Sequence, residues 1–521
     1  MDEPPSNANQ QIARSAGTVM LAFLFSQLAG LAAKILIGRT FNQYEVDAFL
    51  AANRPSETLV VIMAGGIFVS SFIPVFVKFL VKEDRRSAWQ LASSTANLIL
   101  IIMTAAGGLI ALFAGPIVKY TLAAFFSPDK QTLTSDLLRI QAISVIFFSL
   151  SGLLIGILNS HKKFLMSALA PAMYQLGQIF GALVLAPSMG IYGLAWGVVI
   201  GSVLNLLIQI PTLLRLRGQY VPTLGLRNPA VGEVLRLMGP RMFGAAVVQL
   251  MVIVNTLLAS KNEGAVYALS YGFSLMIMAQ AVIAQSVATA VMPTFSAQYA
   301  QGKLEDIRRT LASALRSVIL LSVPATAGLI LLGTPIIAFL YQRGKFTPET
   351  TQMVAWALTW YAVGLVFHSV LEVLVRAYYA MHDTKTPVLV GATAMTLSIG
   401  LSLVLAPLFE RLGWMPHGGL ALAVSVSTAL EVTTLFLIMR RRLDGIHGRE
   451  IANGFGIAAL GTLILGIALV FWLQAMQSHS AALTALGGVA VGGAVYGLVL
   501  ILLRVPEVRS LFQAVSRRLS R

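Results

Sequence analysis

Long apolar stretches separated by short polar segments dominate this chain. Each stretch is long enough to form a membrane-spanning helix, because about 20 apolar residues cross a bilayer. Fourteen can be marked, at residues 15–38, 58–80, 89–113, 137–159, 164–186, 191–214, 232–258, 265–292, 310–340, 351–379, 387–408, 418–439, 451–474 and 483–503. The pattern predicts an all-α, polytopic membrane protein with 14 transmembrane helices.

Composition supports this class and narrows the chemistry. Hydrophobic residues make up 57% of the chain and charged residues only 11%, whereas soluble domains carry about 25% charged residues. The absence of cysteine excludes disulfides, thiol nucleophiles and cysteine-ligated zinc. The sequence has no GxxxxGK[ST], HExxH or GxSxG motif, so we predict no catalytic residue, metal or cofactor.

Basic residues gather on one side of the predicted spans. Of the 37 lysines and arginines, 26 fall on the side of the N-terminus and 9 on the opposite side. The positive-inside rule therefore predicts that both termini are cytoplasmic, and it accounts for the net charge of +16 without a nucleic-acid partner. Residues 505–521 alternate apolar and basic positions, which predicts an amphipathic helix on anionic lipid.

The chain resembles itself at an offset of about 220 residues. Residues 70–74, which close the second span, correspond to 289–293, which close the eighth. The triplet 193–195 opening the sixth span returns as 419–421 opening the twelfth. Because the offset covers six helices, an even number, the copies share one orientation. We therefore predict two six-helix lobes related by a pseudo-two-fold axis along the membrane normal, as in rocking transporters.

This repeat predicts a division of the chain into five parts. They are a cytoplasmic N-terminal segment (1–14), an N-lobe (15–217), a C-lobe (218–443), two extra helices (444–504) and a cytoplasmic amphipathic tail (505–521).

Polar side chains inside the spans are the candidates for function, because they are costly there. On the first span, Gln27 and Lys34 share one helix face. Lys34 either extends to the outer interface or faces a cavity. Arg54 and Glu57 flank the start of the second span beside Asn53, as a local ion pair or as an anion-binding arginine oriented by the carboxylate.

Further candidates lie on later spans. Arg241 begins the seventh span, either at the interface or facing a cavity, and Gln249 and Asn255 lie deeper in it. Glu431 is a lone carboxylate in the twelfth span, a candidate for protonation or cation binding. If Lys34, Arg54 and Arg241 converge between the lobes, they form a cationic cavity suited to a phosphate-bearing substrate.

Several short motifs together resemble the MurJ (MviN) family of lipid II flippases, within the multidrug/oligosaccharidyl-lipid/polysaccharide exporter superfamily. The resemblance runs over nearly all spans. The motifs are Asp47-Ala48-Phe49 with Arg54, Ala64-Gly65-Gly66 through Phe72-Ile73-Pro74-Val75-Phe76, Gly156-Ile157-Leu158-Asn159, residues 190–197, Met238-Gly239-Pro240 with Gln249 and Asn255, Arg376-Ala377-Tyr378-Tyr379-Ala380, and residues 383–388.

The resemblance implies a fold and an activity. In that family two six-helix lobes enclose a cationic cavity for the diphosphate-sugar head of lipid II, and the last two helices form a groove for its polyprenyl tail. It implies a secondary transporter of the bacterial cytoplasmic membrane, working by alternating access on membrane potential or an ion gradient. Lipid II, membrane lipids and wall-synthesis enzymes are the implied partners.

The sequence departs from the family at cavity positions. The first-span pattern S-R-x-x-G-x-x-R-D is here residues 26–34, where Gln27 and Ala33 stand in place of the two arginines and Lys34 in place of the acid. Tyr-Ala-Asp-Arg at the eighth span is here residues 267–270, ending in Ser270. Spans 7, 11 and 12 contain no aspartate for the sodium site proposed in some members. Our predicted substrate-binding set is Arg54, Lys34, Arg241, Gln27, Asn53, Glu57, Gln249, Asn255 and Ser270, with Glu431 for ion coupling.

These departures leave alternatives open. One is an exporter of another polyprenyl-linked oligosaccharide or amphiphile, and another is a degenerate, non-transporting scaffold for wall synthesis. A membrane-embedded transferase would need a carboxylate or His-Asp cluster at one membrane face, which the sequence does not contain.

Overall fold

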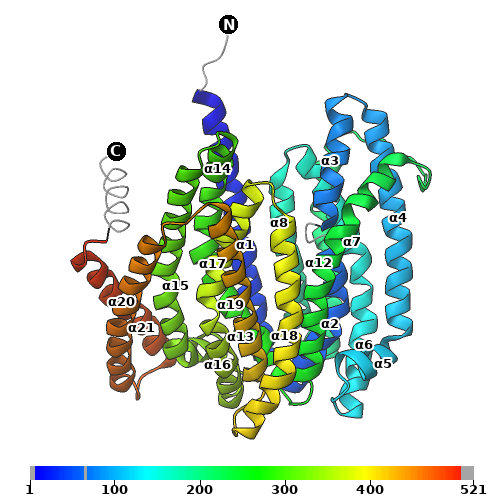
Figure 1. Cartoon of the computed structure of the whole chain (residues 1–521). Helices are drawn as coiled ribbons and strands as arrows, with labels where there is room; N and C mark the ends of the chain where they lie inside the picture. The colour runs from blue at the N-terminus through cyan, green and yellow to red at the C-terminus, as the bar shows by residue number, and fades with distance from the viewer. Residues whose placement is uncertain (1–5, 64–66, 506–521) are drawn as a thin grey trace. The chain divides into compact units, whose positions relative to one another are not determined.

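The computed structural model describes residues 6–63 and 67–505, and every regular element among them is helical (Figure 1). The chain divides after Glu263 into two compact units, each described below by itself. The predicted tail helix at 505–521 lies outside the described residues except for Val505.

Unit 1 contains fourteen helical elements in its described residues. They are α1 (Ser6–Thr40), α2 (Gln43–Met63), α3 (Ile67–Val81), α4 (Arg85–Leu112), α5 (Ala114–Ile117), the π-helical turn η1 (Val118–Leu122), α6 (Pro128–Ala142), α7 (Ser144–Ser160), α8 (Phe164–Phe180), the π-helical turn η2 (Gly181–Leu185), α9 (Ala186–Met189), α10 (Ile191–Leu207), α11 (Ile210–Arg215) and α12 (Pro229–Ala259).

Unit 2 contains ten helical elements in its described part. They are α13 (Ala265–Gln280), the π-helical turn η3 (Ala281–Gln285), α14 (Ser286–Ala300), α15 (Leu304–Tyr341), α16 (Pro348–Val363), α17 (Leu365–Ala380), α18 (Lys385–Arg411), α19 (His417–Arg442), α20 (Gly448–Ala475) and α21 (Ala481–Leu502).

Twelve helical segments of the described residues are long and apolar enough to cross a membrane, or up to 14 if each of two bent pairs is one span. The bent pairs are Pro229–Gly239 with Gly244–Ala259, at 52°, and Pro348–Val363 with Leu365–Ala380, at 47°. Helices suit a bilayer because their backbone polar groups are satisfied internally. The prediction of an all-α polytopic membrane protein is confirmed, and its count of 14 is the upper limit.

The second predicted span begins earlier than the sequence pattern indicated. Its apolar run starts at residue 58, but α2 begins at Gln43, so Arg54 and Glu57 lie inside a helix and not at its start. Residues 43–57 are rich in polar side chains, and a search for apolar runs therefore does not detect this part of the helix. Several of those side chains find partners within unit 1, as described below, and this pairing lowers the cost of carrying them in the helix.

Glycines bring α8 and the adjoining turn η2 into direct backbone contact with α10. A Cβ atom added to Gly177 would lie 2.2 Å from the Cα of Gly201, and one added to Gly181 would lie 2.8 Å from the Cα of Gly197. Small residues at helix interfaces allow this close approach in membranes. The contact fixes the position of α8, which carries part of the candidate site.

Two glycines at repeat-related positions occupy similar surroundings. Gly193 opens α10 against the backbone of Leu185 and Ala186, and Gly419 near the start of α19 lies against Leu405 and Ala406. Each glycine therefore meets a Leu-Ala pair of the preceding helical hairpin, at the offset noted in the sequence. This likeness supports the duplication, which stays a prediction.

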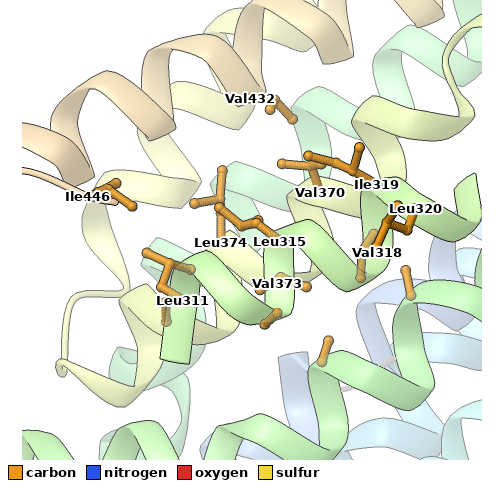
Figure 2. Packing of buried hydrophobic residues seen from close by; sticks show 14 of the residues in the cluster. Leu311, Leu315, Val318, Ile319, Leu320, Val370, Val373, Leu374, Val432 and Ile446 are labelled. Atoms are coloured by element: carbon orange, nitrogen blue, oxygen red, sulfur yellow. The ribbon is translucent and has the colours of Figure 1, made fainter. Parts of the chain in front are cut away.

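An apolar core holds unit 2 together around α15. Leu311, Leu315 and Val318 of α15 pack with Val373 and Leu374 of α17 (Figure 2). The helices α20 and α21 attach to the same α15. Tyr496 of α21 donates a hydrogen bond to the Leu320 carbonyl at 2.6 Å. Gly461 of α20 has no side chain, which leaves room for the Tyr496 ring.

The motif that begins at Asp383 has a structural role at the start of α18. The Asp383 carboxylate accepts hydrogen bonds from the backbone N–H of Lys385 and Thr386, and Arg442 of α19 donates to it at 2.6 Å. Burial acts to raise the pKa of Asp383, but the hydrogen bonds from Thr386 and Arg442 outweigh it and lower that pKa to about 2. The carboxylate therefore joins the ends of α18 and α19 as an anion.

We expect Gly177→Ala to destabilise unit 1 by about 1–3 kcal/mol, because the added methyl group must push α8 away from α10. The melting temperature of the purified chain in detergent measures this change. Gly108→Ala on α4 is the matched control, since nothing lies within 4 Å of its added Cβ. Equal melting temperatures for the two variants would contradict the close contact.

Candidate functional site

A carboxylate on α2 holds two neighbouring side chains of the same helix. Asn53 donates to Glu57 Oε1 at 2.8 Å, and Arg54 NH1 donates to Glu57 Oε2 at 2.8 Å. The Arg54 side chain is 19% exposed and that of Glu57 43%. The Arg54 Nε is buried and has no hydrogen-bond partner in the described part of the chain. Arg54 is thus oriented by Glu57 and retains an unused donor.

Helix α8 contributes the next members. Gln178 Nε2 donates to the Tyr174 hydroxyl oxygen at 2.8 Å, and Tyr174 also shares a side-chain hydrogen bond with Asn53. The Tyr174 ring packs edge-on against Phe148, with centroids 5.0 Å apart. Polar side chains of α8 and α2 therefore form one continuous network.

Lys34 of α1 lies in the same region. Helix α1 packs on α8, where the Gln175 amide lies 3.5 Å from a Cβ built at Gly30. Lys34 is half-buried and within electrostatic range of both Glu57 and Arg54. We call Lys34, Asn53, Arg54, Glu57, Tyr174 and Gln178 the polar cluster of unit 1.

The predicted residues of α12 occupy different positions. Gln249 accepts a hydrogen bond from Thr58 at 3.2 Å, one turn beyond Arg54 on α2. Asn255 donates to the Met251 sulfur on its own helix. Arg241 is exposed and donates to Ser70 and Ser71 of α3.

Gln249 therefore contacts α2, which carries Arg54, whereas Arg241 contacts α3. Gln27, also exposed, lies two turns before Lys34 on α1. Lys34 and Arg54 lie within electrostatic range of each other inside unit 1. Arg241 bonds to hydroxyl groups of α3, and the convergence of the three cations between the lobes stays a prediction.

The two predicted residues of unit 2 have separate surroundings. Ser270 of α13 is half-buried, and its carbonyl accepts a hydrogen bond from Ser274. Glu431 of α19 is 7% exposed, and a Cβ built at Gly391 of α18 would lie 3.0 Å from its carboxylate. Within the described residues Glu431 forms no ion pair. Residues 6–63 and 67–505 contain no group of three or more His, Asp or Glu placed to hold a metal.

Sequence reasoning missed Tyr174 and Gln178. The signal was available, because a Tyr-Gln-x-x-Gln stretch interrupts an otherwise apolar fifth span and puts two polar side chains on one helix face.

Lys130 is one of the nine basic residues that the charge distribution placed on the side opposite the N-terminus. Lys130 lies in the first turn of α6, is 3% exposed and donates to the fully buried Asp47 of α2 at 2.9 Å. Its ammonium group lies 4.2 Å from the Phe126 ring centroid and 4.9 Å from that of Tyr44. The pair anchors the first half of α2, two turns from Arg54.

Apolar grooves run along α15 in unit 2. One, with a volume of about 800 Å³, lies between Val323 and Leu331 of α15 and residues 459–471 of α20. Another, of about 330 Å³, lies between α15, α17, α19 and α20, with Phe367, Phe436 and Phe455 among its walls. Their linings are almost entirely apolar, which suits a hydrocarbon chain.

Comparison with known proteins places the chain among flippase relatives. The family model described as "Lipid II flippase MurJ" matches residues 40–487. A lipid II flippase MurJ from Burkholderia cenocepacia is 32% identical over 432 residues, covering 80% of this chain and 82% of the relative. A probable lipid II flippase MurJ from Vibrio cholerae is 28% identical, covering 95% of this chain and 97% of the relative.

Solved structures agree with these relatives. A structure titled "Lipid II flippase MurJ, inward closed conformation" has a TM-score of 0.81 at 25% identity and covers 93% of this chain and 98% of the other. An inward-facing MATE family transporter of the MOP superfamily has a TM-score of 0.69 at 16% identity, covering 80% of this chain and 94% of the other. The second likeness concerns the fold alone.

We expect Lys130→Met to destabilise the chain by about 3–5 kcal/mol, because it leaves the Asp47 carboxylate buried without its cation. Thermal unfolding in detergent measures the loss. Lys78→Met is the control, since Lys78 pairs with Glu233 at an exposed position. A Lys130→Met variant as stable as the control would show that the buried pair does not hold α2 to α6.

Proposed function

This chain belongs to the lipid II flippase MurJ family, and we propose that it moves lipid II from the inner to the outer leaflet of the bacterial cytoplasmic membrane by alternating access. The observation that carries the proposal is the match over residues 40–487, together with a half-buried arginine, Arg54, oriented by a carboxylate in unit 1. The protein is a multi-pass membrane protein of a transporter family.

The polar cluster of unit 1 supports a role in binding the diphosphate-sugar headgroup. Arg54 offers an unused Nε donor, and guanidinium groups match phosphate oxygens. Lys34 adds a second positive charge near it. Asn53 and Glu57 orient Arg54, and Gln249 bonds to the same helix through Thr58. We further propose that Gln27, Arg241, Asn255 and Ser270 contact the substrate at other stages of transport.

The apolar groove along α20 supports a site for the polyprenyl tail. Its walls consist of aliphatic and aromatic side chains of α15 and α20, and burial of hydrocarbon contributes about 0.8 kcal/mol per CH₂. The groove suits a long lipid chain because α15 and α20 pack along one another.

Energy coupling is proposed through an ion or the membrane potential, without a bound nucleotide or a catalytic step. Glu431 is the candidate coupling group, since a buried carboxylate without a basic partner among the described residues favours binding a proton or cation. We also propose that both termini are cytoplasmic, from the lysine and arginine distribution, and that wall-synthesis enzymes are partners.

We expect Arg54→Ala to abolish rescue of a bacterium depleted of its own lipid II flippase, because the headgroup loses its guanidinium contact. Growth after depletion is the measurement, with immunoblotting of membranes to show that the variant is inserted. Arg139→Ala is the control, as Arg139 is an exposed arginine that pairs with Asp136 on α6. Full rescue by Arg54→Ala would remove Arg54 from the mechanism, and no rescue by the native chain would favour the other exporter or the scaffold.

We expect Gly466→Trp to weaken lipid II binding about tenfold, because the indole fills the groove between α20 and α15. Native mass spectrometry of the detergent-solubilised chain with added lipid II measures binding. Gly456→Trp is the control on the same helix, where nothing lies within 4 Å of the added Cβ. Equal binding by both variants would place the tail elsewhere.

A further inference from the structure

The Tyr174 hydroxyl accepts hydrogen bonds within the polar cluster of unit 1. Gln178 donates to it at 2.8 Å, and Asn53 shares a hydrogen bond with it. An asparagine amide has two N–H donors, so Asn53 can donate to Glu57 and to Tyr174 at the same time. The two amides thus act as donors toward the hydroxyl oxygen.

The proton of the Tyr174 hydroxyl has no acceptor among the described residues. A tyrosine hydroxyl accepts two hydrogen bonds and donates one. Among residues 6–63 and 67–505, the Tyr174 hydroxyl donates no hydrogen bond. The Glu57 carboxylate of the network accepts from Asn53 and Arg54, and within the described residues it accepts no hydrogen bond from Tyr174. The arrangement fixes the oxygen and leaves its O–H available for another oxygen atom.

The surroundings of Tyr174 keep this donor in place. Gln178 and Asn53 are both buried, and the ring is half-buried against Phe148. The direct contact of Gly177 with Gly201 holds the backbone of α8 three residues further along. Because buried amides hold the Tyr174 side chain in place, binding a ligand there costs little additional side-chain entropy.

We propose that Tyr174 is a further substrate-contacting residue, which donates a neutral hydrogen bond to an oxygen atom of the transported headgroup beside Arg54. This inference rests on the proposed function. The acceptor is an oxygen of the diphosphate or of the attached sugars, since both present the same chemistry to an O–H donor. Tyr174 therefore adds a directional contact without adding positive charge.

The test is equilibrium binding to the full-length Tyr174→Phe chain in detergent by native mass spectrometry. We expect lipid II to bind about tenfold more weakly, because the ring stays packed on Phe148 while the donor is lost. Undecaprenyl diphosphate, which lacks the sugars, is the second probe. An equal loss for both probes assigns the contact to the diphosphate, and a loss for lipid II alone assigns it to the glycan.

Tyr192→Phe is the matched control. Tyr192 is also a half-buried tyrosine of unit 1, with a side-chain hydrogen bond to Asp136, and it lies outside the polar cluster. We expect it to bind both probes like the native chain. Melting temperatures of the two variants show whether any loss of binding reflects unfolding.

A double-mutant cycle separates direct contact from an effect through Arg54. If Tyr174 contacts the headgroup, Tyr174→Phe weakens binding further in the Arg54→Ala background. If Tyr174 only orients Arg54 through Asn53 and Glu57, the second substitution has no further effect, which would overturn the proposal.

Failure of this inference is distinguishable from failure of the proposed function. A native chain that binds lipid II, with Tyr174→Phe binding equally well, overturns the role of Tyr174 alone. A native chain that binds neither probe overturns the proposed function.

Discussion

The hydrogen bonds to the Glu57 carboxylate are the interaction on which the candidate site depends. An isolated charge within a bilayer is costly. A cation and an anion on one helix offset this cost only when their side chains are held within hydrogen-bonding distance of each other. Glu57 accepts from Asn53 and Arg54, and through Asn53 it connects to Tyr174 on α8. This carboxylate allows α2 to carry an arginine inside unit 1 whose Nε–H has no partner among the described residues.

The rest of unit 1 restricts the movement of this network. The Asp47–Lys130 pair attaches the start of α2 to α6, and the Ser56 hydroxyl donates to the Gln141 carbonyl of α6 at 3.3 Å. These two attachments lie on either side of Arg54 along the helix. A buried ion pair contributes little net stability but is costly to break, so its value here is in fixing one arrangement of α2.

The fold was largely predictable from the sequence, and the site only in part. Apolar runs located the spans because burial in lipid requires them. They failed at residues 43–57, where polar groups are paired inside the protein. Lys34 and Arg54 were found because charges in spans are rare. Tyr174 was not, since a neutral side chain shows its role only through its partners. The burial of Lys130 depends on Asp47, 83 residues away, a pairing that local patterns do not encode.

The backbone contact between Gly177 and Gly201 has a mechanical consequence. Because no side chain separates α8 from α10 at this point, a shift of either helix along its axis would bring larger side chains of one helix against the backbone of the other. We therefore expect the two helices to move together, so that the Tyr174 and Gln178 side chains of α8 follow any displacement of α10.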